Sequence, residues 1–228
     1  GRAVQDSGIN VLWEGRNALR ILEGLAVTLG ISAVSVVLSL VLGVGVGLAM
    51  RSRLAPLRWL MRAYLEFVRI MPQIVLLFLA YFGLTRLTGV NLDGITASVL
   101  VFTLWGAAEM GDLVRGALIS IPRHQYESAE ALGLDARQAM RFVILPQTVR
   151  RLAPPAVNLV TRMVKTTSLV VLIGVVEVLK VGQQIIDANR FAHPTAALWV
   201  YAVIFLMYFA ICYLISLLSK RLERKWQS

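Results

Sequence analysis

Cysteine and histidine are both scarce in this sequence of 228 residues. The single cysteine, Cys212, lies in an apolar stretch, which favours a buried, unreactive thiol and excludes a disulfide within the chain. The two histidines, His124 and His193, have no cysteine or second histidine at the spacing of a metal site. The sequence therefore predicts neither a disulfide framework nor a bound metal.

Motifs of catalysis and nucleotide binding are also missing. The run K-T-T-S at residues 165–168 imitates the end of a G-x4-G-K-[ST] loop but lacks its glycines. The sequence offers no serine nucleophile elbow and no histidine-based triad. We therefore expect no catalytic residue and no cofactor bound by this chain.

Charged residues are absent from two long stretches, residues 24–50 and 191–219. Each stretch exceeds the roughly 20 residues that a helix needs to cross a bilayer. Hydrophobic residues make up 57% of the chain, against roughly 45–50% in soluble domains, and the mean hydropathy is +0.71. These features predict an all-α, polytopic membrane protein.

Three further apolar segments are interrupted by charged residues. An ionised side chain at the centre of a spanning helix costs at least about 2.5–3.5 kcal/mol, so these helices are expected to face protein or a water-filled path. We predict one membrane domain, residues 1–228, with a polar cytoplasmic insert at residues 121–146. Its five transmembrane helices are predicted at residues 22–50, 60–84, 95–120, 147–176 and 194–219.

The chain carries a net charge of +10, and its basic residues gather in alternate loops. The loops after the first and third spans and the C-terminus are rich in Arg and Lys, whereas the other loops hold only Arg86, Lys180 and Arg190. Because cytoplasmic loops are enriched in Lys and Arg, the N-terminus is predicted outside and the C-terminus in the cytoplasm. This pattern explains the charge without nucleic acid. Residues 1–23 lack a signal-peptide core, so the first span is expected to direct insertion.

The polar insert contains helix start and stop signals. Pro122 suits a first helical turn, and Gly133 suits a left-handed residue after a helix. Asp135 and Gln138 have the spacing of a capping box for a second short helix, which is predicted to end before Pro146. The insert is therefore predicted to form two short helices hinged at Gly133.

Two features inside the spans leave alternatives open. Gly43 and Gly47 form a small-x3-small pair, which packs either within the chain or against a second subunit. Pro72 bends the second span beside Arg69 and Gln73, where a bend serves either a gate or the helix path alone.

Glu109 is the charged residue whose partner is hardest to identify. At about 1.5 Å per residue, it lies about 21 Å along the third span, near the midplane of the bilayer. Asp112 and Arg115 follow at intervals of three on the same face and are expected to pair. Glu109 then either attracts a cationic substrate, such as a basic amino acid, or pairs with Arg162 or Lys165 and holds helices together.

Other charged residues in the spans are interpreted by spacing. Glu66 and Arg69 are three residues apart and are predicted to form a structural pair. Lys165 either meets a substrate carboxylate or anchors the fourth span at the cytoplasmic face.

The insert also carries the spacing E-A-A-x3-G-x9-I-x-L-P, with serine for the first alanine after the glutamate and valine for the isoleucine. With the runs E-F-V-R-I-M-P, R-G-A-L-I-S-I-P, P-P-A-V-N and K-T-T-S-L, residues 66–184 resemble the permease subunits of polar amino acid ABC importers. The resemblance implies a type I ABC importer permease-like fold with a cytoplasmic coupling helix. The residues that it assigns to coupling with the ATPase are Glu127, Ser128, Ala129, Gly133, Leu134, Val143, Leu145 and Pro146.

The resemblance further implies partners and a substrate route. Permeases of this family form homodimers or heterodimers in the bacterial plasma membrane, bind two cytoplasmic ATPase subunits that use ATP and Mg, and receive substrate from an extracytoplasmic binding protein. Ile70 and Met71 depart from the family pattern before Pro72, so detailed substrate contacts do not transfer. The candidate substrate path comprises Glu109, Asp112, Pro72, Gln73, Lys165, Thr167 and Ser168.

Three functions follow from these patterns. The first is a permease that moves a polar amino acid inward, with a basic one as a hypothesis from Glu109. An ion-coupled secondary amino acid transporter would instead use the buried charges of the third span as an ion relay. A non-transporting membrane scaffold would use the insert for docking only.

Overall fold

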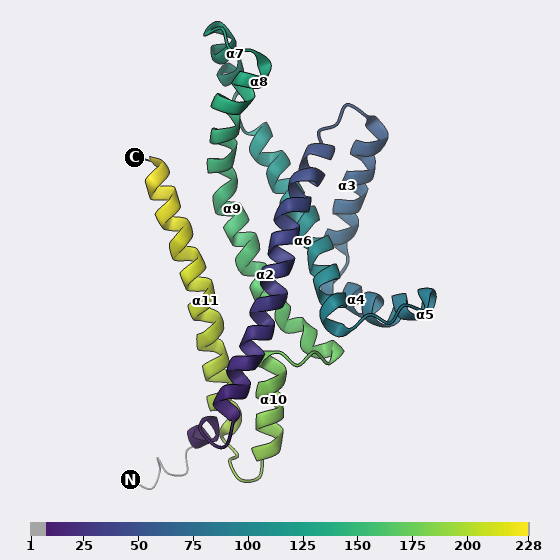
Figure 1. Ribbon diagram of the computed structural model, residues 1–228, viewed down its shortest axis with the longest axis vertical. Helices are drawn as coiled ribbons and strands as arrows, with labels where there is room; N and C mark the ends of the chain where they lie inside the picture. Colours follow the sequence, from purple (N-terminus) through teal and green to yellow (C-terminus); the bar gives the residue numbers. More distant parts are fainter. Residues whose placement is uncertain (1–7, 228) are drawn as a thin grey trace. The chain divides into compact units, whose positions relative to one another are not determined.

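The computed structural model describes residues 8–227, and within that range every regular element is a helix (Figure 1). Four helices are long and apolar enough to cross a membrane, and a broken pair, Ala55–Ile70 with Gln73–Thr88, makes a fifth if it is counted as one span. The all-α, polytopic fold is therefore confirmed. The predictions for residues 1–7 fall outside the described part of the chain.

Ten α-helices follow a short 3-10 helix, Gly8–Leu12. They are α2 (Asn17–Ala49), α3 (Ala55–Ile70), α4 (Gln73–Phe78), α5 (Leu84–Thr88), α6 (Gly94–Ile119), α7 (Arg123–Ala131), α8 (Ala136–Gln138), α9 (Leu145–Thr166), α10 (Val178–Asn189) and α11 (Ala196–Gln227). Two π-helical segments, Leu79–Gly83 and Ala139–Ile144, and a second 3-10 helix, Thr167–Ile173, lie between them. Helices α2, α6, α9 and α11 overlap four of the predicted spans, but α9 ends at Thr166, before the predicted end at residue 176, and α11 continues to Gln227, past the predicted end at residue 219.

Helix α10 is the element that the sequence did not predict. It was expected to be part of an outer loop because its 12 residues include Lys180 and Asp187, and so it is too short and too polar for a span. Its apolar side is nevertheless buried at Val178, Val181 and Ile185. A short amphipathic helix of this kind is stabilised by its packing, which hydropathy does not reveal.

The second predicted span breaks at Met71 and Pro72. The last backbone hydrogen bond of α3 runs from the N–H of Met71 to the carbonyl of Phe67, at 3.1 Å. Met71 has an extended backbone, with φ −77° and ψ 131°, and Pro72 has no N–H to continue the ladder. The expected bend is therefore a complete break, after which α4 begins at Gln73.

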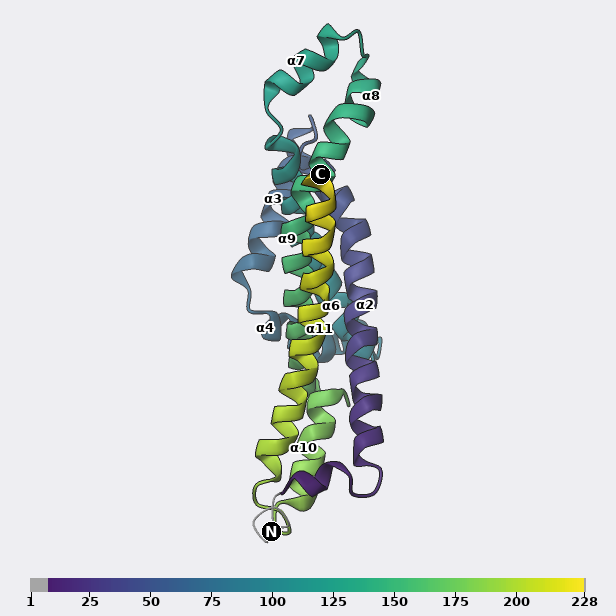
Figure 2. The same ribbon diagram turned by 90° about the vertical axis from the view of Figure 1, so that its left-hand side faces the viewer.

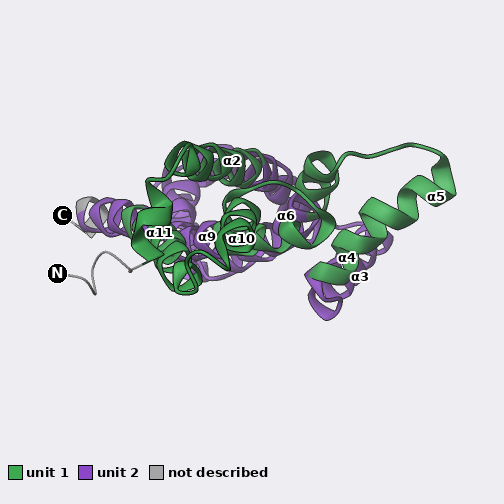
Figure 3. Cartoon of the chain, turned by 90° about the horizontal axis from the view of Figure 1, so that it is seen from below, with its two compact units in different colours: residues 1–34, 74–101, 163–214 green, residues 35–73, 102–162, 215–228 purple. Residues whose placement is uncertain are grey.

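The chain divides into two compact units, each built from separated segments (Figure 3). Residues 1–34, 74–101 and 163–214 form the first unit. Its main apolar core joins the 3-10 helix, the start of α2, α10 and the first half of α11, and Figure 2 shows α10 beside the first turns of α11. The fully buried side chains of this core include Val11, Val178, Ile185 and Val200.

The second unit comprises residues 35–73, 102–162 and 215–228. Here the second half of α2 packs closely on α6 through glycine. A methyl group added to Gly47 would lie 2.7 Å from the carbonyl oxygen of Gly111, and one added to Gly43 would lie 2.4 Å from Cβ of Met110. Of the two alternatives for this glycine pair, the structure therefore favours packing within the chain.

Candidate functional site

The polar insert begins with α7, whose end is closed by its own backbone. The N–H of Gly133 donates to the carbonyl of Glu130 at 2.9 Å, and the N–H of Leu134 donates to the carbonyl of Ala129 at 3.1 Å. This pair of bonds is a Schellman motif, which needs a left-handed residue after the helix. Gly133 supplies that conformation with φ +79°, as predicted. No heavy atom lies within 4 Å of a Cβ built on Gly133, so its backbone angle, and not crowding, calls for glycine.

The second part of the insert starts at the predicted capping box. The Asp135 carboxylate accepts hydrogen bonds from the N–H groups of Arg137 and Gln138, each at 2.8 Å. The Gln138 side chain accepts one from the N–H of Asp135 at 2.9 Å. The prediction that this helix ends before Pro146 was wrong, because α8 passes through the π-helical segment directly into α9. Pro146 is the second residue of α9, in the first turn, where its missing N–H is tolerated.

The insert presents apolar side chains that nothing in its own fold covers. Leu132 is 80% exposed and Phe142 is 64% exposed, and Met140 and Leu145 are exposed as well. A cavity of about 430 Å³ opens between α7 and the α8 segment, lined by Tyr126, Glu130, Leu134, Asp135, Ala136, Ala139 and Met140. Figures 1 and 2 show α7 and α8 at one end of α9. Exposed apolar groups rimmed by polar ones are typical of a protein-docking surface.

The residues predicted for coupling all lie in this region, but their exposure differs. Glu127 is exposed and pairs with Arg123 one turn earlier, at 3.0 Å. Ala129 is 1% exposed and packs inside, which explains a small residue there. Ser128, Gly133, Leu145 and Pro146 are exposed, whereas Leu134 and Val143 are half-buried.

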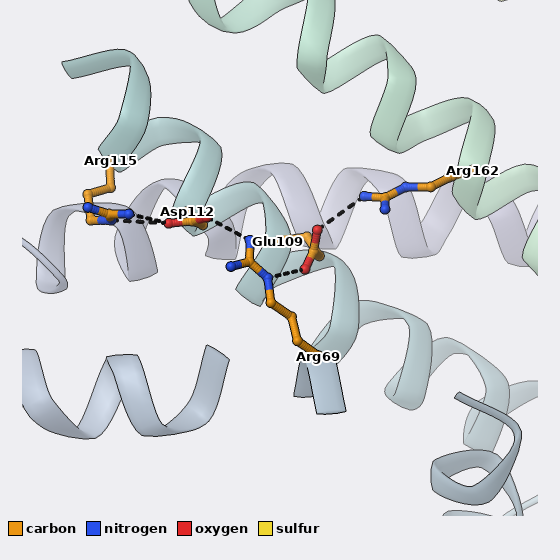
Figure 4. Close-up of polar contacts among 5 residues, drawn as sticks. All are labelled: Arg69, Glu109, Asp112, Arg115 and Arg162. Carbon is orange, nitrogen blue, oxygen red and sulfur yellow. Dashed lines mark hydrogen bonds and ion pairs between the residues drawn. The ribbon is translucent and has the colours of Figure 1, made fainter. Parts of the chain in front are cut away.

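A cluster of five charged residues lies in the second unit, on α3, α6 and α9 (Figure 4). Arg69 donates from Nε to Glu109 at 2.9 Å and from a terminal nitrogen to Asp112 at 2.6 Å. Arg162 donates to the other oxygen of Glu109 at 3.1 Å, and its guanidinium lies 5.3 Å from the centre of the Trp105 ring. Arg115 donates to Asp112 at 2.7 Å. We call Arg69, Glu109, Asp112, Arg115 and Arg162 the arginine–carboxylate cluster.

This geometry decides several predicted pairings. The expected pair of Asp112 and Arg115 is confirmed, and Glu109 pairs with Arg162, one of the two partners considered. The predicted pair of Glu66 and Arg69 was wrong. The planar guanidinium of Arg69 spans the carboxylates at positions i and i+3 of α6, which offer it two charged acceptors at once. Residue spacing does not predict this contact between α3 and α6.

A cleft adjoins the cluster on the side toward α7. It has a volume of about 360 Å³ and lies between α6 and α9. Asp112 and Arg115 line one part of it, and Arg151 lines another, donating to the carbonyl of Ser120 at 2.5 Å. The cleft has the size of a small-molecule site and carries both polar and apolar walls.

The other candidates for the substrate path have varied surroundings. Pro72 is exposed at the break of the second span, and Gln73 follows it as the first residue of α4. In the first unit, Lys165 is exposed and its carbonyl accepts from the Ser168 hydroxyl at 2.9 Å. The Thr167 hydroxyl is fully buried and donates to the carbonyl of Val164 at 2.6 Å, so its donor is used inside the helix.

Glu177 is a polar residue of the first unit that the sequence reading passed over. It is completely buried at the start of α10 and caps that helix. Its carboxylate accepts from the N–H of Lys180 at 2.9 Å and from the hydroxyl of Thr28 in α2 at 3.1 Å. Burial raises the pKa of Glu177 above its ordinary value. The signal was present as a lone carboxylate in the apolar run 169–179.

Comparison with known proteins agrees with this architecture. Residues 35–228 match the family described as binding-protein-dependent transport system inner membrane component. The chain is 36% identical to the probable amino-acid ABC transporter permease protein YckA of Bacillus subtilis, over 90% of this chain and 88% of that protein. It is 31% identical to the probable glutamine ABC transporter permease protein GlnP of the same organism, over 88% of this chain and 91% of the relative.

A solved structure is also similar. The crystal structure of an amino acid ABC transporter with histidines superposes with a TM-score of 0.83 at 26% identity, over 91% of this chain and 94% of that one. The family match covers most of the chain, and the relatives and the solved fold agree with it. The chain therefore belongs to the inner membrane components of binding-protein-dependent transport systems, as a non-catalytic permease subunit of an amino acid ABC importer in the bacterial inner membrane.

Proposed function

We propose that this chain moves an amino acid inward by alternating access, driven by ATPase subunits that dock on its polar insert. It pairs with a second permease subunit, identical or different, and two cytoplasmic ATPase subunits supply the energy from ATP and Mg. An extracytoplasmic binding protein delivers the substrate. The chain contributes the membrane path and the mechanical connection, and binds no cofactor itself.

The observation that carries this proposal is the continuity of the insert with a spanning helix. The α8 segment is capped by its own side chains and runs without interruption into α9. A force applied to the exposed surface around Leu132 and Phe142 is therefore transmitted along α9 and not absorbed by a loose loop. Docking by Glu127, Ser128, Ala129, Gly133, Leu134, Val143, Leu145 and Pro146 remains a prediction from the family resemblance.

The orientation that this function needs agrees with the loop charges. With the N-terminus outside and the C-terminus in the cytoplasm, the insert faces the cytoplasm, where a soluble ATPase is found. Arg51 and Arg53 after α2 and Arg123 and Arg137 in the insert then lie on the cytoplasmic side.

The substrate path proposed for the third span needs revision at Glu109. Both oxygens of its carboxylate are engaged, one with Arg69 and one with Arg162. These contacts favour the helix-pairing alternative over a free carboxylate that attracts a basic amino acid. Pro72, Gln73, Lys165, Thr167 and Ser168 stay as candidate path residues, with Thr167 the weakest because its hydroxyl is buried and bonded.

A reconstituted transporter tests the proposal. The chain, its ATPase and its binding protein are placed in proteoliposomes, and uptake of labelled amino acids is measured with and without ATP in the compartment that faces the insert. We expect uptake only with ATP. Flux that follows an ion gradient and ignores ATP would indicate the secondary transporter, and partner binding without flux would indicate the scaffold.

A glycine variant tests the role of the insert. Gly133→Ala places a side chain in a left-handed backbone conformation, at a cost of about 1–2 kcal/mol, which lowers the equilibrium constant for the docking conformation by roughly 5- to 30-fold. We expect ATP-driven uptake to fall, by at most this factor, with membrane insertion unchanged. Gly30→Ala is the matched control, because nothing lies within 4 Å of its added methyl group and its backbone is helical. Equal uptake in the two variants would contradict coupling through the insert.

A further inference from the structure

The arginine–carboxylate cluster lies deep in the membrane. Glu109 is the sixteenth of the 26 residues of α6, which places it about 22 Å from Gly94 and about 15 Å from Ile119 along the helix axis. A hydrocarbon core of about 30 Å therefore has the cluster close to its middle. Charged groups at this depth are stable only when they face protein or a water-filled cavity.

The arginines of the cluster are more exposed than the carboxylates. The side chains of Arg162 and Arg69 are 55% and 40% exposed, whereas those of Glu109 and Asp112 are 13% and 18% exposed. Exposed guanidinium groups at the centre of a bilayer cannot face lipid, and we infer that this surface of the second unit lines the water-filled part of the path. The surface that the cluster offers to that water is consequently made mainly of guanidinium groups.

The charge of the cluster is positive. Three arginines face two carboxylates, so the net charge is 3 − 2 = +1. Each carboxylate already accepts from two arginines, Glu109 from Arg69 and Arg162, and Asp112 from Arg69 and Arg115. A cation would have to displace one of these arginines, whereas an anion adds to a surface that already attracts it.

We propose that the arginine–carboxylate cluster binds the side-chain carboxylate of an acidic amino acid on its way through the membrane. This inference rests on the proposed import function and names the substrate class for the same path. Arg162 is the principal contact, held in place by Glu109 and by the face of Trp105. Glu109 is thus a positioning residue that orients an arginine toward the substrate.

The cleft beside the cluster extends this surface toward the insert. From Asp112 and Arg115 it leads to Arg151, an exposed residue whose guanidinium donates to the carbonyl of Ser120. A carboxylate leaving Arg162 therefore meets a second and a third guanidinium within unit 2, and the volume of about 360 Å³ accommodates a free amino acid. A series of weak, positively charged sites allows a carboxylate to leave as well as to enter.

Equilibrium binding tests the inference. The permease–ATPase complex, without binding protein, is held in lipid nanodiscs at low salt, and binding of labelled glutamate, glutamine and arginine is measured. Glutamate and glutamine have nearly the same shape and differ in the side-chain charge. We expect glutamate to bind at least about tenfold more tightly than glutamine, the effect of one charge-assisted contact, and arginine to bind most weakly.

Variants assign the contact to Arg162. Arg162→Gln is expected to weaken glutamate binding by about tenfold and leave glutamine binding within about twofold, whereas Arg162→Lys retains part of the glutamate preference. Arg150→Gln, an exposed arginine on the same helix, is the matched control and leaves both unchanged. Equal affinity for glutamate and glutamine, or tighter binding of arginine, overturns the inference.

The same complex separates this inference from the proposed function. When binding protein and ATP are restored, ATP-dependent uptake of glutamine or arginine alone keeps the importer and rejects the acidic substrate. Glutamate preference with flux that ignores ATP keeps the acidic site and rejects ATP coupling. Absence of binding for all three amino acids rejects the acidic site, and ATP-dependent uptake of any other amino acid keeps the importer.

Discussion

At the scale of single residues, Glu109 shows how a charge is tolerated inside a spanning helix. Its two oxygens accept from Arg69 and Arg162, which come from α3 and α9. The carboxylate therefore joins three helices of the second unit through charge-assisted bonds. Each such bond to a charged group contributes about 1.5–3 kcal/mol.

Glu109→Gln is expected to lower the free energy of unfolding by about 1–3 kcal/mol, because a neutral amide accepts more weakly and leaves two arginines facing each other. Tryptophan fluorescence of the purified protein during thermal unfolding in detergent measures the change. Glu66→Gln is the control, since Glu66 is exposed and its change is expected to stay within about 0.5 kcal/mol. An equal loss in both variants would argue against the cluster as a source of stability.

Glu177 gives a prediction about pH. Burial raises its pKa in the folded chain above the ordinary value of 4.5, so the fold favours the protonated carboxyl. The stability that this group contributes is present below the unfolded pKa and is lost as the pH rises through the folded pKa. Glu177→Gln removes the titration, so its unfolding temperature, followed from about pH 4 to about pH 8, should fall less than that of the wild type. Parallel curves for the two proteins would contradict a raised pKa.

At the scale of elements, the close contact of α2 and α6 depends on glycine. Gly47 faces the backbone of Gly111 and the side chain of Val114, whereas Gly45 on the same helix has nothing within 4 Å. The two positions differ in their neighbours and share the same helical conformation. Alanine substitutions at the two positions therefore distinguish the effect of helix packing from the effect of helix propensity.

Gly47→Ala is expected to destabilise the protein by about 1–3 kcal/mol, because the added methyl group would lie 2.7 Å from the carbonyl oxygen of Gly111. Gly45→Ala is expected to raise stability by about 0.5–1 kcal/mol, since alanine favours a helix and meets no neighbour there. Thermal unfolding of both variants in the same detergent measures the difference. A stabilising Gly47→Ala would mean that the helices separate in solution.

The predictions from the sequence were correct for features that depend on residues within a single element. The charge-free spans, the left-handed Gly133 and the capping box of Asp135 and Gln138 all depend on neighbours within a few residues. The break at Pro72 was located but underestimated, because proline predicts a lost hydrogen bond and not how the next residues continue.

The features that the sequence did not predict depend on contacts between distant segments. The partners of Arg69 lie 40 and 43 residues away on α6, so the nearer Glu66 was the plausible wrong choice. Helix α10 and Glu177 were missed for the same reason, since Thr28, which bonds Glu177, lies 149 residues away. The spacing of residues along one helix does not predict contacts with distant segments of the chain.

At the scale of the whole molecule, the loop charges predict which side of the membrane each loop occupies. In a Cys212→Ser background, Asn91→Cys before α6 and Glu130→Cys in α7 place single thiols at exposed positions. A membrane-impermeant maleimide is expected to label residue 91 in intact cells and residue 130 only after permeabilisation. The reverse pattern would place the insert outside and leave the ATPase without access to it.

The continuous helical path from the insert into the membrane has one more consequence. The stretch Ala136–Ile173 has 38 residues, so at about 1.5 Å per residue it is about 57 Å long, nearly twice the roughly 30 Å of hydrocarbon. With its headgroups the bilayer is about 40–45 Å thick, so a stretch of this length can extend about 12–17 Å into the water beyond it. A protein that binds the insert at the end of this stretch needs no affinity for lipid. It can dissociate and be replaced while every span stays in the membrane.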